Sequence, residues 1–461
     1  MNTSLGQRGY SIIKEEHKPN IISEMRKELT VKPFVHKNYA GNNNPFPVYC
    51  ESIRKLYLPR YFGIQKFGIP KNYKINHGEP INIPFAKELR ENQKPIVEAF
   101  INSTNDEHGG GGIISIPCGY GKTVIGLNIA SRLKVKTLIV VHKEFLLNQW
   151  KERIVEFVPS ARIGKIQANV IKTQDKDIVI GMLQSISMKE YPPNTFDSFG
   201  LVIFDECHHL GAEVFSKALL KASCKYTLGL SATPKRDDGL TKVFEWYLGD
   251  IVYQIKKRET EEVLVKIIEY YSQEEKYCQE ERNFKGLVNS AKMVNNICEY
   301  LPRTKIIVEE LEPLINESRK VLVLSNRVQH LKDIQELVDK LNICTTGFYI
   351  GGMKEKDLQK SIEKDVILAT FSMAEEGFDC KELDSIVLAS PKSKIEQAIG
   401  RILRKKACDR DKVPIVIDIA DEFSVFKNQN IKRRKFYKKN KYQIQNINKN
   451  PFKPIELDFI D

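Results

Sequence analysis

The sequence IISIPCGYGKT, at positions 113–123, combines the residue types that bind phosphate. An apolar strand that runs through a glycine-bearing loop into a helix directs backbone N–H groups and the positive end of the helix dipole at an anion. Lys122 would neutralise phosphate charge, and the hydroxyl of Thr123 would bind Mg²⁺. Ile116 stands where the pattern G-x-x-x-x-G-K-S/T has its first glycine, so a tight turn that happens to contain Gly-Lys-Thr is the alternative. The expected phosphate loop consists of Pro117, Cys118, Gly119, Tyr120, Gly121, Lys122 and Thr123.

Two carboxylates follow a second apolar run, GLVIF at positions 200–204. An open α/β sheet binds ligands at the carboxyl ends of its strands, so Asp205 and Glu206 are expected beside the phosphate loop. Asp205 would hold Mg²⁺ through its water shell, and Glu206 would polarise an attacking water. A metal site at the Cys-His-His of positions 207–209 is the competing interpretation, but adjacent ligands without a fourth partner make it unfavourable.

The elements that must position these residues are short β-branched runs that alternate with helical patterns. Such alternation is typical of parallel sheets wrapped by helices. One series of strands is expected at 137–141, 178–180, 201–204 and 227–230, and a second at 321–324, 365–369, 386–389 and 413–419. The apolar residues of 146–157, Trp150 among them, recur at helical spacing and are assigned to packing. The glycine run at 109–112 is expected to be a flexible turn.

The chain therefore divides into two tandem α/β domains with flanking regions. Residues 1–85 lack sustained periodicity, so the first forty are expected to be loosely ordered and the rest to form a small accessory region. The segment 256–300 lacks a strand rhythm and is expected to connect the domains. From 426 to 461, ten Lys/Arg face three Asp/Glu, which fits either a nucleic-acid-contacting tail or a solvated disordered one. The expected parts are 1–85, 86–255, 256–300, 301–425 and 426–461.

Composition narrows the classes of protein that fit. The chain has 461 residues and a formal net charge of +13, which favours a polyanionic partner. Nine cysteines show no Cys-x-x-Cys pair and no regular spacing, as expected of reduced intracellular thiols rather than a disulfide framework. No run approaches the roughly 18 apolar residues that span a bilayer, and the N-terminus lacks an apolar signal segment. We therefore expect a soluble intracellular protein without a membrane partner.

Taken together, the motifs resemble those of superfamily 2 helicases of the DExH type. The resemblance covers nearly the whole of the two predicted α/β domains. Asp205 to His208 matches the DExH box, and six further motifs follow the order seen in that family. These are LRENQ at 89–93, the segment 137–150 ending in NQW, SATP at 231–234, SNR at 325–327, TFSMAEEGFD at 370–379 and QAIGRILR at 397–404. The resemblance implies two RecA-like domains that use ATP and Mg²⁺ to act on nucleic acid.

The resemblance also implies roles for individual residues. Gln93 would bond the adenine edge, Gly377 and Asp379 would contact the nucleotide, and Ser231 and Thr233 would couple hydrolysis to strand movement. Nucleic-acid contacts are implied for His142, Lys143, Gln184, Ser325, Asn326, Arg327 and Thr370.

Catalysis is implied for residues of both domains. Lys122, Asp205 and Glu206 of the first domain would be joined by Gln397, Arg401 and Arg404 of the second. Arg401 and Arg404, one helical turn apart on the same face, would stabilise charge on the γ-phosphate from across a cleft. Closing and opening of the cleft would then move the protein along a strand.

The pairing of NQW with SATPKRDDG, at 231–239, resembles the XPB and UvsW branch and related helicases of large DNA viruses. That branch implies double-stranded or branched DNA and roles in transcription, recombination or repair. The expected partners are double-stranded, forked or single-stranded DNA, or RNA, together with transcription or repair machinery. For a viral chain, the location would be host cytoplasm, nucleus or the virion. An RNA helicase is the first alternative, and an ATP-gated nucleic-acid sensor with little turnover is the second. A nuclease-coupled motor would need catalytic carboxylates outside the motor, and none is found.

Overall fold

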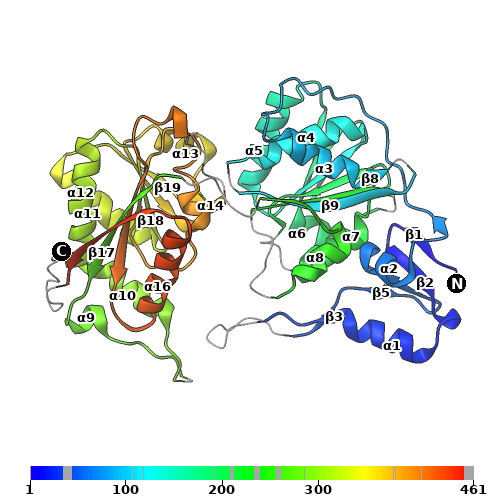
Figure 1. The fold of residues 1–461 in the computed structure, drawn as a ribbon, viewed down its shortest axis with the longest axis horizontal. Helices are drawn as coiled ribbons and strands as arrows, with labels where there is room; N and C mark the ends of the chain where they lie inside the picture. Colours follow the sequence, from blue (N-terminus) through cyan, green and yellow to red (C-terminus); the bar gives the residue numbers. More distant parts are fainter. Residues whose placement is uncertain are drawn as a thin grey trace. The chain divides into compact units, whose positions relative to one another are not determined.

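The computed structural model describes residues 2–34, 44–105, 107–117, 119–192, 194–207, 212–232, 239–255, 261–284, 286–376, 378, 380–405 and 407–450. The chain forms two compact units, Met1–Lys256 and Lys257–Asp461. Each is built around a largely parallel sheet covered by helices, which confirms the predicted α/β class (Figure 1).

The sheet of the first unit has the strand order β12-β11-β13-β10-β14-β15-β9-β16, with β8 paired to β9. Only β8 and β12 run antiparallel to their neighbours. The strands are β8 (Thr104–Asn105), β9 (Gly109–Ser115), β10 (Thr137–Val141), β11 (Ile163–Gln167), β12 (Val170–Lys172), β13 (Ile178–Met182), β14 (Leu201–Phe204), β15 (Tyr226–Ser231) and β16 (Ile251–Gln254).

Helices cover both faces of this sheet, because its central strands are apolar on both sides. One face buries α3 (Lys94–Asn102), α4 (Lys122–Leu133) and α5 (Glu144–Phe157), and the other buries α6 (Leu183–Met188), α7 (Ala212–Lys221) and α8 (Thr241–Leu248). The two layers are visible above and below the sheet in Figure 1.

The glycine run at 109–112 is part of β9, not the flexible turn that its composition predicts. A side chain on Gly111 would place Cβ 2.0 Å from Thr227 Oγ1, and one on Gly112 would place it 2.3 Å from Val252 Cγ1. Glycine is therefore required by the close approach of β15 and β16 to this strand.

The second unit has a seven-stranded sheet in which all paired strands are parallel, in the order β19-β20-β18-β21-β22-β17-β23. The strands are β17 (Leu264–Tyr270), β18 (Val321–Ser325), β19 (Thr346–Tyr349), β20 (Val366–Thr370), β21 (Ser385–Leu388), β22 (Ile415–Asp421) and β23 (Gln443–Lys449). The helices are α9 (Glu275–Cys278), α10 (Ser290–Glu299), α11 (Leu301–Asn316), α12 (Val328–Leu341), α13 (Glu355–Ile362), α14 (Phe371–Glu376), α15 (Glu396–Ile399) and α16 (Ser424–Lys439).

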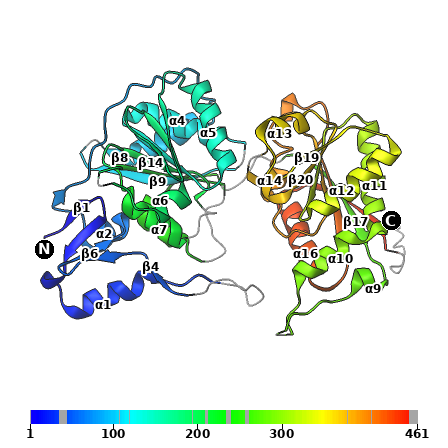
Figure 2. The same ribbon diagram turned by 180° about the vertical axis from the view of Figure 1, so that it is seen from behind.

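The expected connector at 256–300 differs from the structure, because β17 is an inner strand between β22 and β23. Lys266 and Glu269 interrupt its apolar run and hide the strand pattern. The expected basic tail also differs, since α16 covers the sheet and β23 extends it (Figure 2). Residues 451–461 lie outside the described part.

The N-terminal region is more ordered than its weak periodicity predicts. Within residues 2–34 lie β1 (Ser4–Gly6), β2 (Gly9–Ile13), α1 (Pro19–Glu28) and β3 (Thr30–Val31). β4 (Phe46–Pro47), β5 (Cys50–Glu51), β6 (Lys55–Leu58), α2 (Arg60–Phe67) and β7 (Asn72–Tyr73) follow. A small sheet, β5-β6-β2-β1-β7, buries Leu5, Tyr10 and Ile12 in one core with the α6 to α8 layer. Strands of two to five residues are too short to give a readable period.

Candidate active site

The predicted motifs of the first unit gather at one edge of its sheet. Strands β9, β10, β13, β14 and β15 are parallel neighbours, and each ends directly before or within a motif. Their carboxyl ends therefore present the phosphate loop, His142 and Lys143, Gln184, the acidic pair and Ser231 along a single edge.

The phosphate loop has the backbone that such a loop requires. Gly119 and Gly121 have φ angles of 92° and 81°, in the region that favours glycine. Gly121 is the N-cap of α4, so Lys122 and Thr123 begin the helix at its positive end. A Cβ on Gly121 would lie 2.5 Å from Gln93 Nε2. Cys118 lies outside the described residues.

Gln93 lies against this loop, with 3% of its surface exposed. Its Nε2 donates to Tyr120 O at 2.9 Å, and its Oε1 accepts from Arg90 N at 3.0 Å. The amide thus ties α3 to the phosphate loop. Adenine recognition by Gln93 stays a prediction.

The acidic pair and the loop lysine form one cluster. Lys122 Nζ lies 2.9 Å from Glu206 Oε1, and both side chains are largely buried. Glu206 has a φ of 48°, a left-handed backbone that is rare for a residue other than glycine and is typical of functional sites. This turn directly follows β14 and leaves Glu206 beside Lys122.

Asp205 is held by two donors. Trp150 Nε1 donates to Oδ2 at 2.7 Å, and the backbone N–H of Glu206 donates to Oδ1 at 3.0 Å. Burial, together with the charge of Glu206, raises the pKa of Asp205 to about 6, against the lowering effects of Trp150 and Lys122. Asp205 is therefore a buried carboxylate whose negative charge is incompletely neutralised.

The contact of Trp150 with Asp205 is the functional feature that the sequence analysis missed. The spacing of Trp150 with Leu146 and Ile154 assigns it to packing, and it is indeed fully buried. A Cβ on Gly126 of α4 would lie 3.1 Å from its Cη2, so the indole packs closely against α4 at a position that has no side chain. The residue type was the one sequence signal of a polar partner for Trp150, because a buried indole N–H needs an acceptor.

The remaining predicted contacts of this edge have internal partners. Gln184 Nε2 donates to His142 O at 3.2 Å, which joins the first turn of α6 to the loop after β10. Lys143 Nζ lies 5.9 Å from the centre of the Phe145 ring. Ser231 is buried at the end of β15. Thr233 and the histidines at 208 and 209 lie outside the described residues, and no metal-binding cluster of His, Cys, Asp or Glu occurs among those described.

The motifs of the second unit also lie at a carboxyl edge, because Ser325 of β18 pairs with Thr370 of β20. Ser325 is fully buried, where its hydroxyl accepts from Arg327 N at 3.1 Å and bonds His330 Nδ1 at 3.0 Å. Thr370 Oγ1 lies 3.4 Å from Ser372 Oγ. Of this motif pair, Thr370 is the more accessible.

Arg327 and Asn326 are engaged within the unit. Arg327 donates from Nε to Asn295 Oδ1 at 2.5 Å and from Nη2 to Ala291 O at 2.9 Å, which fastens α10 to the loop after β18. Asn326 Nδ2 donates to Pro391 O at 3.0 Å. Nucleic-acid contact by these two residues stays a prediction.

The expected arrangement of Arg401 and Arg404 on one helical face differs from the structure. Helix α15 ends at Ile399 with Gly400 as its C-cap, so the arginines lie in the turns beyond it. Arg401 is buried and donates from Nη1 to Phe378 O at 3.0 Å, whereas Arg404 is half-buried. Gln397 lies on α15 itself, and Gly377 and Asp379 lie outside the described residues.

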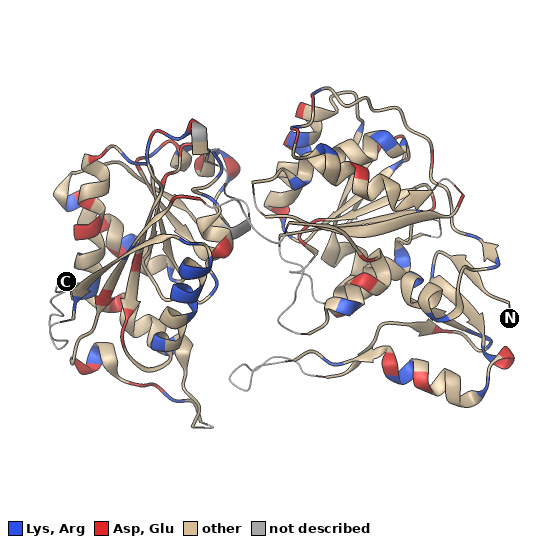
Figure 3. Cartoon of the chain, viewed as in Figure 1, with Lys and Arg blue, Asp and Glu red and all other residues tan. Residues whose placement is uncertain are grey.

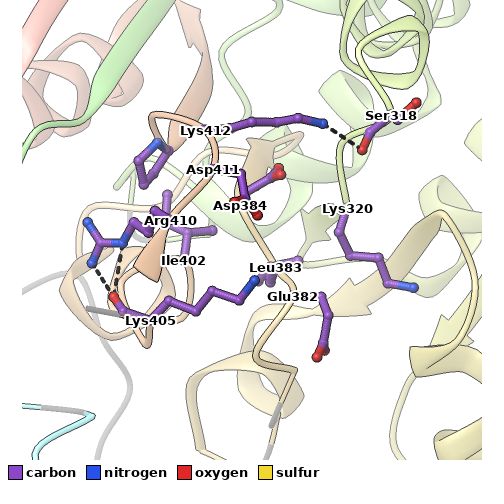
Figure 4. A pocket seen from close by; sticks show the side chains of 11 residues that line it. Ser318, Lys320, Glu382, Leu383, Asp384, Ile402, Lys405, Arg410, Asp411 and Lys412 are labelled. Atoms are coloured by element: carbon purple, nitrogen blue, oxygen red, sulfur yellow. Dashed lines mark hydrogen bonds between the residues drawn. The ribbon is translucent and has the colours of Figure 1, made fainter. Parts of the chain in front are cut away.

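A cavity at the opposite edge of the second sheet is lined by Ile402 of the segment 397–404, but by none of the predicted site residues. Figure 4 shows it between the segments that precede β18, β21 and β22. Carboxylates and lysines alternate in its lining, and Lys412 Nζ donates to Ser318 O at 2.9 Å across it. It does not belong to the candidate active site.

Comparison with known proteins identifies the family. Residues 86–236 match the family described as Type III restriction enzyme, res subunit, and residues 302–406 match Helicase conserved C-terminal domain. A protein of Acanthamoeba polyphaga mimivirus, named as an ATP-dependent RNA helicase, is 36% identical over 96% of this chain and 87% of its own length. The chain belongs to the superfamily 2 helicases.

Two further comparisons give one relative by sequence and one by structure. A DNA 3'-5' translocase of the XPB type from Sulfurisphaera tokodaii is 27% identical over 78% of the helicase and 89% of its own length. A solved fragment of an HsdR subunit of a type I restriction enzyme from Vibrio vulnificus covers 80% of the helicase and 70% of that chain, with 17% identity and a TM-score of 0.57. The second likeness supports the fold alone.

Among the described residues, no helix is long and apolar enough to cross a membrane.

Proposed function

We propose that this ATP-dependent helicase is a motor on DNA in which Glu206 activates the water that attacks ATP. The observation that carries the proposal is the 2.9 Å contact between Lys122 Nζ and Glu206 Oε1 at the end of the phosphate loop. A cation for the phosphates and a carboxylate for the water therefore lie within one hydrogen bond of each other.

The donor set fits Mg²⁺. Asp205 supplies hard carboxylate oxygens that would hold Mg²⁺ through its water shell, and Thr123 on the first turn of α4 would supply a hydroxyl. Two carboxylates share one ammonium here, so the cluster has an excess negative charge that a divalent cation would neutralise. When bound, Mg²⁺ would offset the charge of the triphosphate.

The ion pair between Lys122 and Glu206 would also be exchanged when ATP binds. A triphosphate in the loop offers Lys122 a stronger anion than one carboxylate, so the ammonium would turn to the phosphates. Glu206 would then be free to accept a proton from water. In the resting state, the same contact keeps the buried Glu206 charge paired.

DNA is the proposed polymer, in single-stranded, double-stranded or forked form, with transcription or repair machinery as partner. The XPB-type relative is named for DNA translocation, and the motifs NQW and SATPKRDDG resemble that branch. The mimivirus relative is named for RNA, which makes an RNA helicase the second candidate. Viral origin would place the protein in host cytoplasm, nucleus or virion.

The test is the ATPase rate of the full chain without polymer and with single-stranded DNA, duplex DNA, forked DNA or single-stranded RNA, at about 50 and about 200 mM salt. We expect duplex or forked DNA to stimulate hydrolysis, more strongly at low salt. Glu206→Gln is expected to lower the stimulated rate by at least about 100-fold. Glu213→Gln, which removes an exposed ion pair on α7, is the matched control.

Each outcome decides between the candidates. Stimulation by RNA alone would establish the RNA helicase. Tight ATP binding without stimulated turnover would establish the sensor. A Glu206→Gln variant with wild-type turnover would exclude Glu206 as the base.

A further inference from the structure

Helix α16 carries a concentration of positive charge that the motor motifs do not use. From Ser424 to Lys441 the sequence has eight Lys/Arg and no Asp/Glu. In the structure this run is a helix of 16 residues that covers β22, rather than a tail. Figure 3 shows basic residues along it.

The two arginines of the run form ion pairs with strands of the same unit. Arg433 Nε lies 2.9 Å from Asp418 Oδ2, and both side chains are almost completely buried. Tyr437 OH donates to the same oxygen at 2.8 Å. Arg434 Nη2 lies 2.7 Å from Glu269 Oε1 on β17. These contacts fix the rotation of α16 about its axis, so one face is held toward the sheet.

The lysines face outward. Lys432, Lys435 and Lys439 are exposed and follow one another at intervals of three and four residues, which places them in one row along the helix. We call this row the lysine stripe. Within the described part of the chain, none of the three forms an ion pair with a carboxylate.

One end of the lysine stripe, at Lys432, lies near the carboxyl edge of the sheet, and the stripe runs from there toward the amino edge, because α16 ends at Lys439 shortly before β23 begins. Arg433 Nη1 donates to Lys392 O at 2.8 Å, which ties α16 to the loop that follows β21. The adjacent Pro391 accepts from Asn326 Nδ2, next to the motif after β18. Partial burial, together with the nearby Lys432, lowers the pKa of Lys394 in the same loop. Positive groups thus gather from α16 to the edge that carries Thr370.

We propose that the lysine stripe binds the phosphate backbone of nucleic acid and extends the contact surface of the motor beyond its motifs. The proposal rests on the proposed function, because the polymer is the one that the motor moves on. Lysines are flexible point charges that neutralise phosphates without reading bases. An acidic protein surface is disfavoured, because the Lys432 end of the stripe lies near the sheet edge where the motifs after β18 and β20 lie.

The experiment measures affinity of the full chain for a fluorescently labelled DNA duplex by anisotropy, over a range of salt concentrations. The test variant is Lys432→Gln/Lys435→Gln/Lys439→Gln. The control is Lys305→Gln/Lys332→Gln/Lys364→Gln, which removes the same charge from three exposed lysines of the same unit outside the stripe. A third variant changes the stripe lysines to arginine and retains the charge.

We expect the test variant to bind about 10-fold more weakly or worse at ~100 mM salt, and the slope of log affinity against log salt to fall by about 2 to 3. The control and the arginine variant should bind as the wild type does. Thermal unfolding midpoints confirm that all variants are folded.

Equal losses in the test and control variants would overturn the proposal, because net charge alone would then explain binding. Unchanged affinity in the test variant would overturn it too. A wild type that binds no nucleic acid and has no polymer-stimulated ATPase would instead refute the proposed function. The two failures are therefore distinguishable.

Discussion

The candidate active site places two carboxylates, one ammonium and one indole N–H in a largely buried space. Burial raises the pKa of Asp205, so its ionised form needs every donor that the fold provides. Trp150 Nε1 is the one side-chain donor to Asp205 among the hydrogen bonds of the described residues. We therefore propose that Trp150 is a positioning residue that favours ionised Asp205 and would orient it for Mg²⁺.

The change Trp150→Phe tests this assignment, since it keeps an aromatic ring and removes the N–H. We expect Mg²⁺-dependent nucleotide affinity to fall by about 10- to 100-fold. Affinity measured in the presence of a chelator should change little, because the phosphate loop is intact. The measurement is titration of a fluorescent nucleotide with and without Mg²⁺.

The matched control is Trp246→Phe, which makes the same change where the indole packs edge-on against Phe62 at 5.3 Å. Trp246→Phe should leave the Mg²⁺ dependence intact. If Trp150→Phe weakened nucleotide affinity equally with and without Mg²⁺, a general packing role would replace the positioning role.

At the scale of elements, α16 depends on one buried ion pair with β22. Arg433 and Asp418 are each about 2% exposed, so removing the arginine leaves an unpaired buried carboxylate. Tyr437 still donates to that oxygen but adds no positive charge. The pair is therefore expected to contribute most of the stability with which α16 is attached to the sheet.

We expect Arg433→Met to lower the free energy of unfolding of the second unit by about 3 to 5 kcal/mol. Arg434→Met is the neighbouring control, and its partly exposed pair with Glu269 should contribute only about 1 kcal/mol. Denaturant unfolding monitored by circular dichroism measures both. Equal effects of the two changes would show that burial of the pair is not the deciding factor.

At the scale of the whole molecule, the N-terminal region is part of the first unit rather than an appendage. Arg60 of α2 is buried and donates to Lys225 O and His108 O, each at 2.8 Å. Tyr247 OH of α8 donates to Val48 O at 2.6 Å. The carbonyls that Arg60 binds precede β15 and β9, so the region attaches at the amino edge of the sheet, opposite the candidate active site.

This attachment predicts that Arg60→Met destabilises the first unit by about 2 kcal/mol, because three backbone carbonyls lose a charged donor. Nucleotide affinity should be unchanged, since the site lies at the other edge. Thermal unfolding and nucleotide titration of the same variant measure the two effects. A loss of nucleotide affinity without destabilisation would contradict this division of roles.

The sequence by itself determined the α/β class, the order of the motifs and the types of residue at the phosphate loop and acidic pair. Local composition suffices there, because apolar strands, glycines with positive φ and charged loop residues are signals within short windows. Only the tertiary structure showed that Trp150 meets Asp205, that β17 and β23 complete the second sheet, and that Arg433 faces inward. Each depends on partners far apart in the chain, such as the pairing of Leu264 with Ile415 and Gln443, which no local pattern contains.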